Sequence, residues 1–159
     1  MKNLLIAGII GATISVSCST TAKTAQANRA EFLKLKGNWE ISSVNYDKNY
    51  RVKPFDEGAD AQCWVGSQWK LVPNNYTGTY SINGGSDCPS VTQPIKFEVL
   101  NATQFQFKKI ADGTKAKQNV VGYTLNLINQ SDSQFSLEQN IPSGGENVRV
   151  VYNFQKVSE

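Results

Sequence analysis

Apolar and polar residues alternate along most of the chain after residue 37, in short segments separated by turn-forming residues. Alternation with a period of two is typical of β-strands that bury one face, and no long helical pattern lies between the segments. Such segments at hairpin spacing indicate an antiparallel meander. The pattern predicts eight strands, over residues 37–46, 62–72, 76–83, 93–100, 104–110, 119–129, 134–139 and 147–157.

Eight consecutive strands leave two unpaired edges unless the sheet closes on itself. We therefore predict an all-β fold, an eight-stranded antiparallel up-and-down barrel with a short N-terminal helix; a two-sheet sandwich is the alternative. Asn28 is a suitable N-cap for this helix, over residues 29–35. The interior of such a barrel is just wide enough to be filled by side chains or to hold one small ligand.

The first predicted strand opens with Gly37, whose missing Cβ permits a tight turn into the strand. Trp39 and Ile41 are two residues apart, so both side chains face the same side of the sheet. The apolar positions after them shift by one residue. This change predicts a β-bulge near residues 42–43.

A tight turn at residues 74–75 predicts the register of the second and third strands, because Asn tolerates positive φ. In this register Trp69 faces Tyr80. If the same residue pairing is extended along both strands away from the turn, it brings Cys63 close to Cys88. We expect a disulfide between these two cysteines, worth about 3 kcal/mol; a pair of buried free thiols is the alternative.

The N-terminus has the pattern of a targeting segment, with Lys2 followed by an apolar run over residues 4–14. The small residues that follow, Ser15-Val16-Ser17, directly precede Cys18 and resemble a bacterial lipobox, although Leu is usual where Ser15 stands. The resemblance implies cleavage before Cys18 and acylation of this cysteine. An ordinary secretory signal or an uncleaved anchor is the alternative. The apolar run is shorter than the roughly 20 residues of a membrane-spanning helix.

These features divide the chain into a lipoprotein signal peptide (1–17), a flexible tether (18–28) and a barrel domain (29–159). The expected location is the bacterial outer membrane, where lipid on Cys18 would hold the protein. The segment after Cys18 lacks an acidic cluster, which favours the periplasmic side over the cell surface.

The formal net charge is only +3, and no basic run interleaves with aromatic residues, so we expect no nucleic-acid partner. The chain has no histidine, which removes Ser–His and Cys–His catalysis and the usual zinc sites. Asp56, Glu57 and Asp60 lack the spacing of a calcium loop and are expected in a solvated loop. We expect no enzyme activity, no cofactor and no metal.

The chain resembles the small lipocalin-like lipoproteins of the Bacteroidetes type over roughly residues 31–157. The residues that carry this resemblance are Leu35-x-Gly37-x-Trp39, Cys63-Trp64, Thr77-Gly78-Thr79-Tyr80 and Cys88. The resemblance implies that Trp39 plugs the closed end of the barrel and that the long first loop lies over the open mouth. In lipocalins a basic residue after the last strand covers this tryptophan. Arg149 and Lys156 are the only basic residues of the last predicted strand here, and Arg149 is expected to face outward.

The resemblance also implies that the barrel binds a small apolar molecule. The candidate ligand-binding residues are Trp69, Tyr80, Phe97, Phe107, Tyr123, Phe135 and Tyr152. A second function stays open, a protein-interaction or inhibitor module of the envelope with a filled barrel and an unknown protein partner. An enclosed cavity favours the first function, and a filled interior favours the second.

Overall fold

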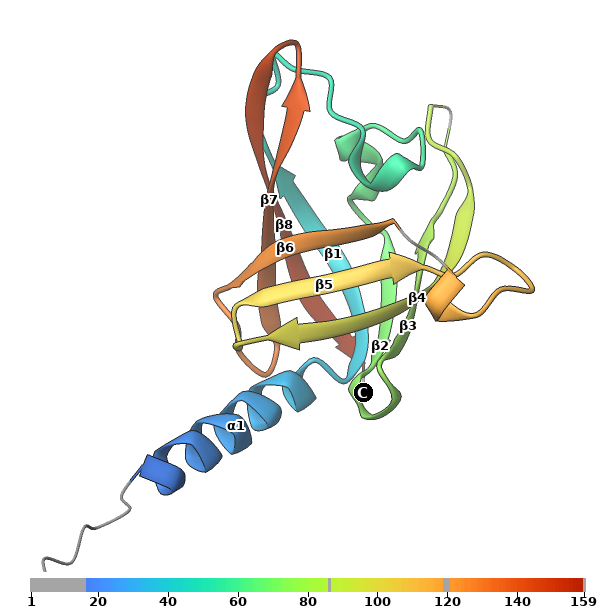
Figure 1. Cartoon of the computed structure of the whole chain (residues 1–159). Coiled ribbons are helices and arrows are strands. Elements are labelled where there is room, and N and C mark those ends of the chain that lie inside the picture. Colours follow the sequence, from blue (N-terminus) through green and yellow to red (C-terminus); the bar gives the residue numbers. More distant parts are fainter. Residues whose placement is uncertain (1–16, 86, 119–120, 159) are drawn as a thin grey trace, which may run out of the picture.

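The computed structural model describes residues 17–85, 87–118 and 121–158, which form a closed antiparallel barrel (Figure 1). Each strand pairs with its neighbours in sequence, and the last strand pairs back with the first. The predicted eight-stranded up-and-down barrel is therefore confirmed. The strands are β1 (Gly37–Asn45), β2 (Gln68–Val72), β3 (Thr77–Ile82), β4 (Val91–Leu100), β5 (Gln104–Lys109), β6 (Gly122–Ile128), β7 (Gln134–Ser143) and β8 (Glu146–Ser158).

Alternation along the strands places one continuous apolar cluster inside the barrel, as the pattern predicts. On β3, for example, Gly78, Tyr80 and Ile82 are buried and the residues between them are partly exposed. Trp69 pairs with Tyr80, so the predicted register of β2 and β3 is confirmed. The predicted bulge is also confirmed, because the β1–β8 register shifts between Ile41 and Ser43.

The boundaries of the β2–β3 hairpin differ from the prediction. Residues 73–76 link the strands, because Pro73 opens a short 3₁₀ helix (η3, Pro73–Asn75) in place of a two-residue turn. The expected start of β2 was also wrong. Cys63 lies in another 3₁₀ helix (η2, Ala61–Trp64), capped where the Asp60 carboxylate accepts the Gln62 backbone N–H at 3.0 Å. Because this capped turn contains Cys63, β2 begins only after it, at Gln68.

Among the later strands, β6 and β7 begin or end at residues other than those predicted. β6 begins at Gly122, and residues 119–120 lie outside the described part of the chain. β7 continues through Pro142 to Ser143, past its predicted end at residue 139. Pro142 pairs with Asn147 close to the hairpin turn, where a missing N–H removes little of the ladder.

Helix α1 (Ser17–Lys34) is longer than predicted and includes the segment 18–28 that was expected to be a flexible tether. The segment contains neither Gly nor Pro, the two residues least favourable in a helix, and includes three Ala, the most favourable one. Residues 1–16, most of the predicted signal peptide, lie outside the described residues. Among the helices that the structure does describe, none combines the length and the apolar character needed to cross a membrane.

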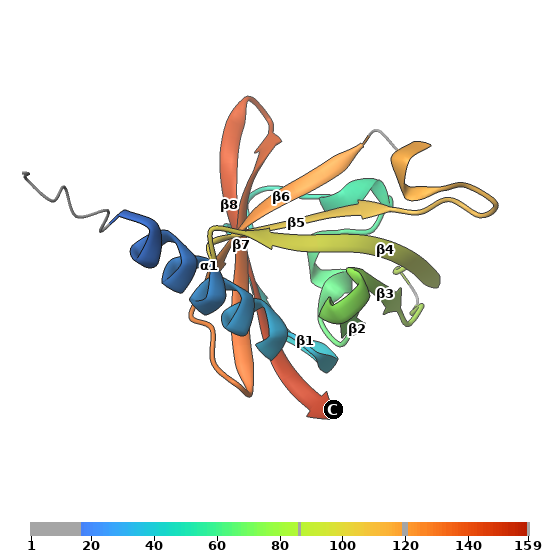
Figure 2. The same cartoon turned by 60° about the horizontal axis from the view of Figure 1, so that its bottom comes forward.

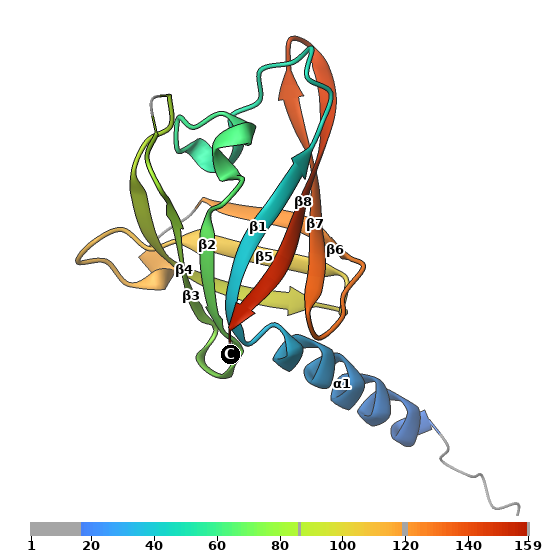
Figure 3. The ribbon, with the colours of Figure 1, turned by 180° about the vertical axis from the view of Figure 1, so that it is seen from behind.

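The last turn of α1 meets one end of the barrel, near the end of β8, and the rest of the helix projects away from the barrel (Figures 1 and 3). Gly37 has φ 134°, a conformation that favours glycine, and turns the chain from α1 into β1. Trp39 is fully buried there, and its ring meets that of Phe135 at 4.7 Å. The Lys156 ammonium lies 5.5 Å from the Trp39 ring centroid, so Lys156 rather than Arg149 covers this tryptophan.

Candidate ligand site at the barrel mouth

The end of the barrel opposite α1 is covered by the long connection between β1 and β2 (Figures 1 and 2). This connection contains η1 (Pro54–Asp56) and η2. A disulfide joins Cys63 of η2 to Cys88, with Cα atoms 5.5 Å apart. The predicted cysteine pair is therefore present, and it ties the connection to the segment between β3 and β4.

Within this connection, buried residues and one backbone hydrogen bond flank a short segment on both sides. The backbone N–H of Ala61 donates to the Val52 carbonyl at 2.7 Å, and Val52, Ala59 and Ala61 are buried. We call the six residues between these anchors, 53–58, the flap. Gly58 ends the flap at φ +68°, a conformation that a side chain would strain.

Phe55 of the flap points into the aromatic interior and is only 5 % exposed. Its ring centroid lies 4.9 Å from Trp64, 5.2 Å from Phe107, and 5.4 Å from both Tyr123 and Tyr152. Most of these contacts are edge-to-face, the geometry that aromatic pairs favour. The chain itself therefore fills the barrel interior at this end.

The flap holds Phe55 in a strained backbone conformation. Phe55 has φ 58° and Asp56 has φ 54°, both in the left-handed region. This region costs a residue with a side chain roughly 1–2 kcal/mol. Such strain persists only where surrounding contacts enforce it, and it is concentrated at functional sites.

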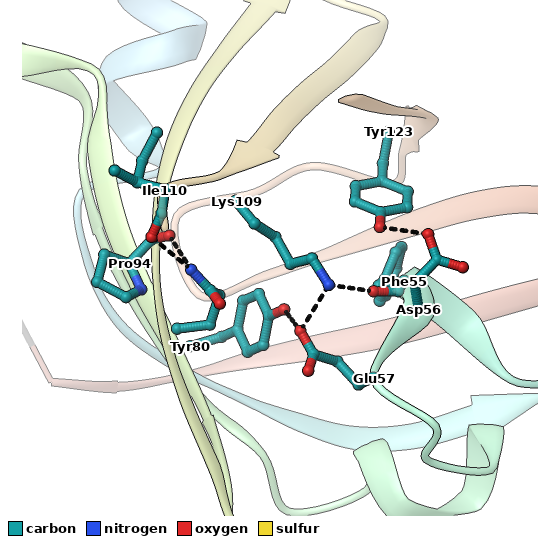
Figure 4. A network of polar contacts seen from close by, with 9 residues as sticks. Phe55, Asp56, Glu57, Tyr80, Pro94, Lys109, Ile110 and Tyr123 are labelled. Carbon is teal, nitrogen blue, oxygen red and sulfur yellow. Dashed lines mark hydrogen bonds and ion pairs between the residues drawn. The ribbon is translucent and has the colours of Figure 1, made fainter. Parts of the chain in front are cut away.

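A polar network lies around Phe55 at the mouth (Figure 4). The Glu57 carboxylate accepts a hydrogen bond from the Tyr80 hydroxyl and forms an ion pair with Lys109 Nζ at 3.0 Å. Lys109 Nζ also donates to the Phe55 carbonyl at 2.8 Å. The Tyr123 hydroxyl donates to Asp56 Oδ2 at 2.8 Å. The barrel wall thus supplies donors, and the flap supplies every acceptor of these four contacts.

The environment keeps the tyrosine hydroxyls protonated. Burial, followed by the hydrogen bond to the Glu57 carboxylate, raises the pKa of Tyr80 far above its ordinary value. Burial and the Asp56 carboxylate raise the pKa of Tyr123 in the same direction. Both phenols are neutral hydrogen-bond donors at physiological pH, as any tyrosine is, and the raised pKa values keep them neutral at alkaline pH as well.

Trp64 provides a further donor beneath the flap. Its side chain is fully buried and packs on Phe55 and Tyr80, with ring centroids 4.9 and 5.2 Å away. In the described part of the chain, no hydrogen-bond acceptor pairs with Trp64 Nε1. A buried N–H without a partner costs free energy, so this position favours an incoming acceptor.

The structure divides the seven predicted ligand-binding residues into two groups. Phe97 and Phe135 lie toward the closed end, where they contact Phe32 and Trp39. The others surround Phe55 or contact residues that do. This second group is Trp69, Tyr80, Phe107, Tyr123 and Tyr152.

Sequence reasoning missed the residues that complete the site: Phe55, Glu57, Trp64 and Lys109. Glu57 was expected in a solvated loop, but its side chain is only 12 % exposed. A signal for Lys109 was present, because it continues the inward alternation of Phe105 and Phe107. No comparable pattern marks Phe55, whose position depends on the path of a long loop.

Neither a family model nor a curated protein matches the chain. The barrel is compatible with a lipocalin-like fold. Within residues 17–85, 87–118 and 121–158, no group of three or more His, Cys, Asp or Glu side chains is arranged to hold a metal ion. Proposals about function therefore depend on the geometry of the mouth.

Proposed function

We propose that this protein is a non-enzymatic, lipid-anchored protein of the bacterial outer membrane, facing the periplasm, that binds a small apolar ligand in its barrel. The ligand enters at the mouth and displaces the Phe55 ring. The observation that carries this proposal is the position of Phe55, a strained loop residue that occupies the centre of an aromatic cage. The lipid anchor is the one implied by Cys18.

The flap is suited to such a displacement because it is short and its anchors lie outside it. Moving residues 53–58 breaks neither the Ala61–Val52 hydrogen bond nor the disulfide. Release of the two positive-φ residues offsets part of the lost aromatic packing. The vacated space would be lined by Trp64, Phe107, Tyr123 and Tyr152, which contact Phe55 in the closed form.

Binding of the neutral fluorescent probe N-phenyl-1-naphthylamine tests this proposal. Phe55 acts as an internal competitor, so Phe55→Ala is expected to bind the probe at least about tenfold more tightly than the wild type. Trp69→Ala is expected to weaken probe binding, because the Trp69 ring packs on Trp64 and Phe107, two of the rings that surround Phe55.

Phe135→Ala is the matched control, because it removes the same side chain at the closed end of the barrel. This variant is expected to lose about 3–5 kcal/mol of stability without tighter probe binding. If neither the wild type nor Phe55→Ala binds the probe, the proposal is wrong.

A protein-interaction or inhibitor module is the second candidate function. The filled interior favours it, and so does a groove of about 440 Å³ over β4, β5 and β6. The groove is lined by the polar residues Lys96, Glu98, Gln106 and Lys108 and by aromatic residues that include Tyr76, Phe107 and Tyr123. Absence of probe binding in every variant would leave this candidate as the preferred function.

A further inference from the structure

We propose that the ligand of the barrel mouth is a small apolar carboxylate, whose apolar group replaces the Phe55 ring and whose carboxylate replaces that of Glu57. This inference rests on the proposed function and specifies the chemistry of the same site. The flap places an aromatic ring and a carboxylate two residues apart, and both are held by the barrel. The flap therefore has the chemistry of an internal ligand.

The groups that remain on the barrel after the flap moves determine which ligand fits. Lys109 Nζ loses the Glu57 carboxylate and the Phe55 carbonyl, and the Tyr80 and Tyr123 hydroxyls lose their carboxylate acceptors. All three groups are donors in this network, and Lys109 carries a positive charge (Figure 4). A ligand without an acceptor would leave them unsatisfied.

The cost of leaving Lys109 without a partner provides the selectivity. Its side chain is only 25 % exposed, and the Glu57 side chain that neutralises it is only 12 % exposed. Removing one partner of a partly buried ion pair is unfavourable, because water does not fully replace the lost charge. A neutral apolar ligand incurs this cost, whereas a carboxylate restores the pair.

Trp64 is an independent observation that points the same way. Its indole N–H is buried, and none of the described residues accepts it even in the closed form. The ring packs directly on Phe55, so a ligand in the Phe55 space also lies against Trp64. An oxygen-bearing ligand offers this donor an acceptor that the described protein residues do not provide.

Isothermal titration at pH 7.5 with three matched compounds tests the inference: 3-phenylpropanoate, 3-phenylpropanol and 3-phenylpropylamine. A charge-assisted hydrogen bond contributes enough for the wild type to bind the acid at least about tenfold more tightly than the alcohol. The amine is expected to bind most weakly, because it places a positive charge beside Lys109. Decanoate in a parallel titration distinguishes an acyl chain from an aromatic group, and tight binding of either acid supports the inference.

Two adjacent lysines on β5 provide the variants. Lys109→Met keeps the apolar stem and removes the charge, so the preference for acid over alcohol is expected to fall close to one. Lys108→Met removes the same charge from the outward face, where Lys108 lines the polar groove, and is expected to keep the preference. A preference lost in Lys108→Met instead would place the acid in the groove and overturn the inference.

Glu57→Gln keeps the test informative if Lys109→Met folds poorly. It weakens the internal competitor without changing the barrel wall, so 3-phenylpropanoate is expected to bind several-fold more tightly than in the wild type. Equal binding of acid and alcohol by the wild type would overturn the inference while leaving the proposed function standing. Failure of N-phenyl-1-naphthylamine to bind at all would instead overturn the proposed function, so the two failures are distinguishable.

Discussion

The indole N–H of Trp39 donates a hydrogen bond to the backbone carbonyl of Leu35 at 2.8 Å. This bond joins the end of α1 to the first strand. Both residues are fully buried, and Trp39 also packs edge-on against Phe135. The closed end is therefore organised by one side chain that fills the barrel and fixes the direction in which the chain enters it.

Substitutions at Trp39 are expected to separate its packing from its hydrogen bond. Trp39→Ala should lower the free energy of unfolding by about 3–5 kcal/mol, and Trp39→Phe should lower it less, because most of the apolar contact remains. Lys156→Met, which removes the ammonium over the ring, should cost no more than about 1 kcal/mol. Urea unfolding measures all three, and equal losses for Trp39→Phe and Trp39→Ala would contradict this account.

The Cys63–Cys88 disulfide should stabilise the mouth more than the closed end. Replacing both cysteines with Ser is expected to lower the free energy of unfolding by about 3 kcal/mol, because the unfolded chain gains freedom. Hydrogen exchange should increase in η2 and in the segment near Cys88 before it increases in β1. Recovery of two alkylatable thiols from the native oxidised protein would show that the bridge is absent.

Alkaline pH should destabilise the protein through its buried phenols. Burial is the main cause that raises the pKa of Tyr80, Tyr123 and Tyr152 in the folded state, whereas an unfolded tyrosine ionises near pH 10. The contribution of these protonated phenols to the stability of the folded state is therefore complete below about pH 10. Above it the unfolded chain loses protons that the folded chain retains. Stability therefore falls by up to about 1.4 kcal/mol per pH unit for each of Tyr80 and Tyr152, and by less for the more exposed Tyr123, which solvent screens.

Denaturant titrations between pH 9 and pH 11 measure this slope. Tyr80→Phe should lower stability at neutral pH, because Glu57 loses one hydrogen bond, and should also flatten the alkaline slope. Tyr76→Phe is the control, because Tyr76 is 46 % exposed near α1. An unchanged slope in Tyr80→Phe would contradict the role assigned to that phenol.

The strands and their register could be predicted because each depends on local alternation, as at Trp69 and Tyr80. The mouth could be predicted only in part. Lys109 follows the alternation of β5, but the inward turn of Phe55 depends on positive φ angles at two residues that rarely adopt them. That conformation is enforced by aromatic rings from η2, β5, β6 and β8, and so by contacts distant in sequence.

Lipid attachment at Cys18 stays a prediction, because it depends on the N-terminal pattern alone. Cys18→Ser should abolish acylation and leave a precursor that no longer partitions into detergent. Phase separation in Triton X-114 measures this partition, with a Cys63→Ser/Cys88→Ser variant as the control for loss of thiols elsewhere. Partition of Cys18→Ser equal to that of the wild type would show that lipid on this residue is not the anchor.

The proposed function depends on Phe55, which would occupy the ligand site in the free protein and leave it when a ligand binds. The ring centroids of Phe55 and Tyr152 lie 5.4 Å apart, close enough for nuclear Overhauser effects between their ring protons. We expect these effects in the free protein and expect them to vanish when N-phenyl-1-naphthylamine saturates it, while those between Trp39 and Phe135 remain. Persistence of the Phe55–Tyr152 effects in the saturated protein would contradict the account.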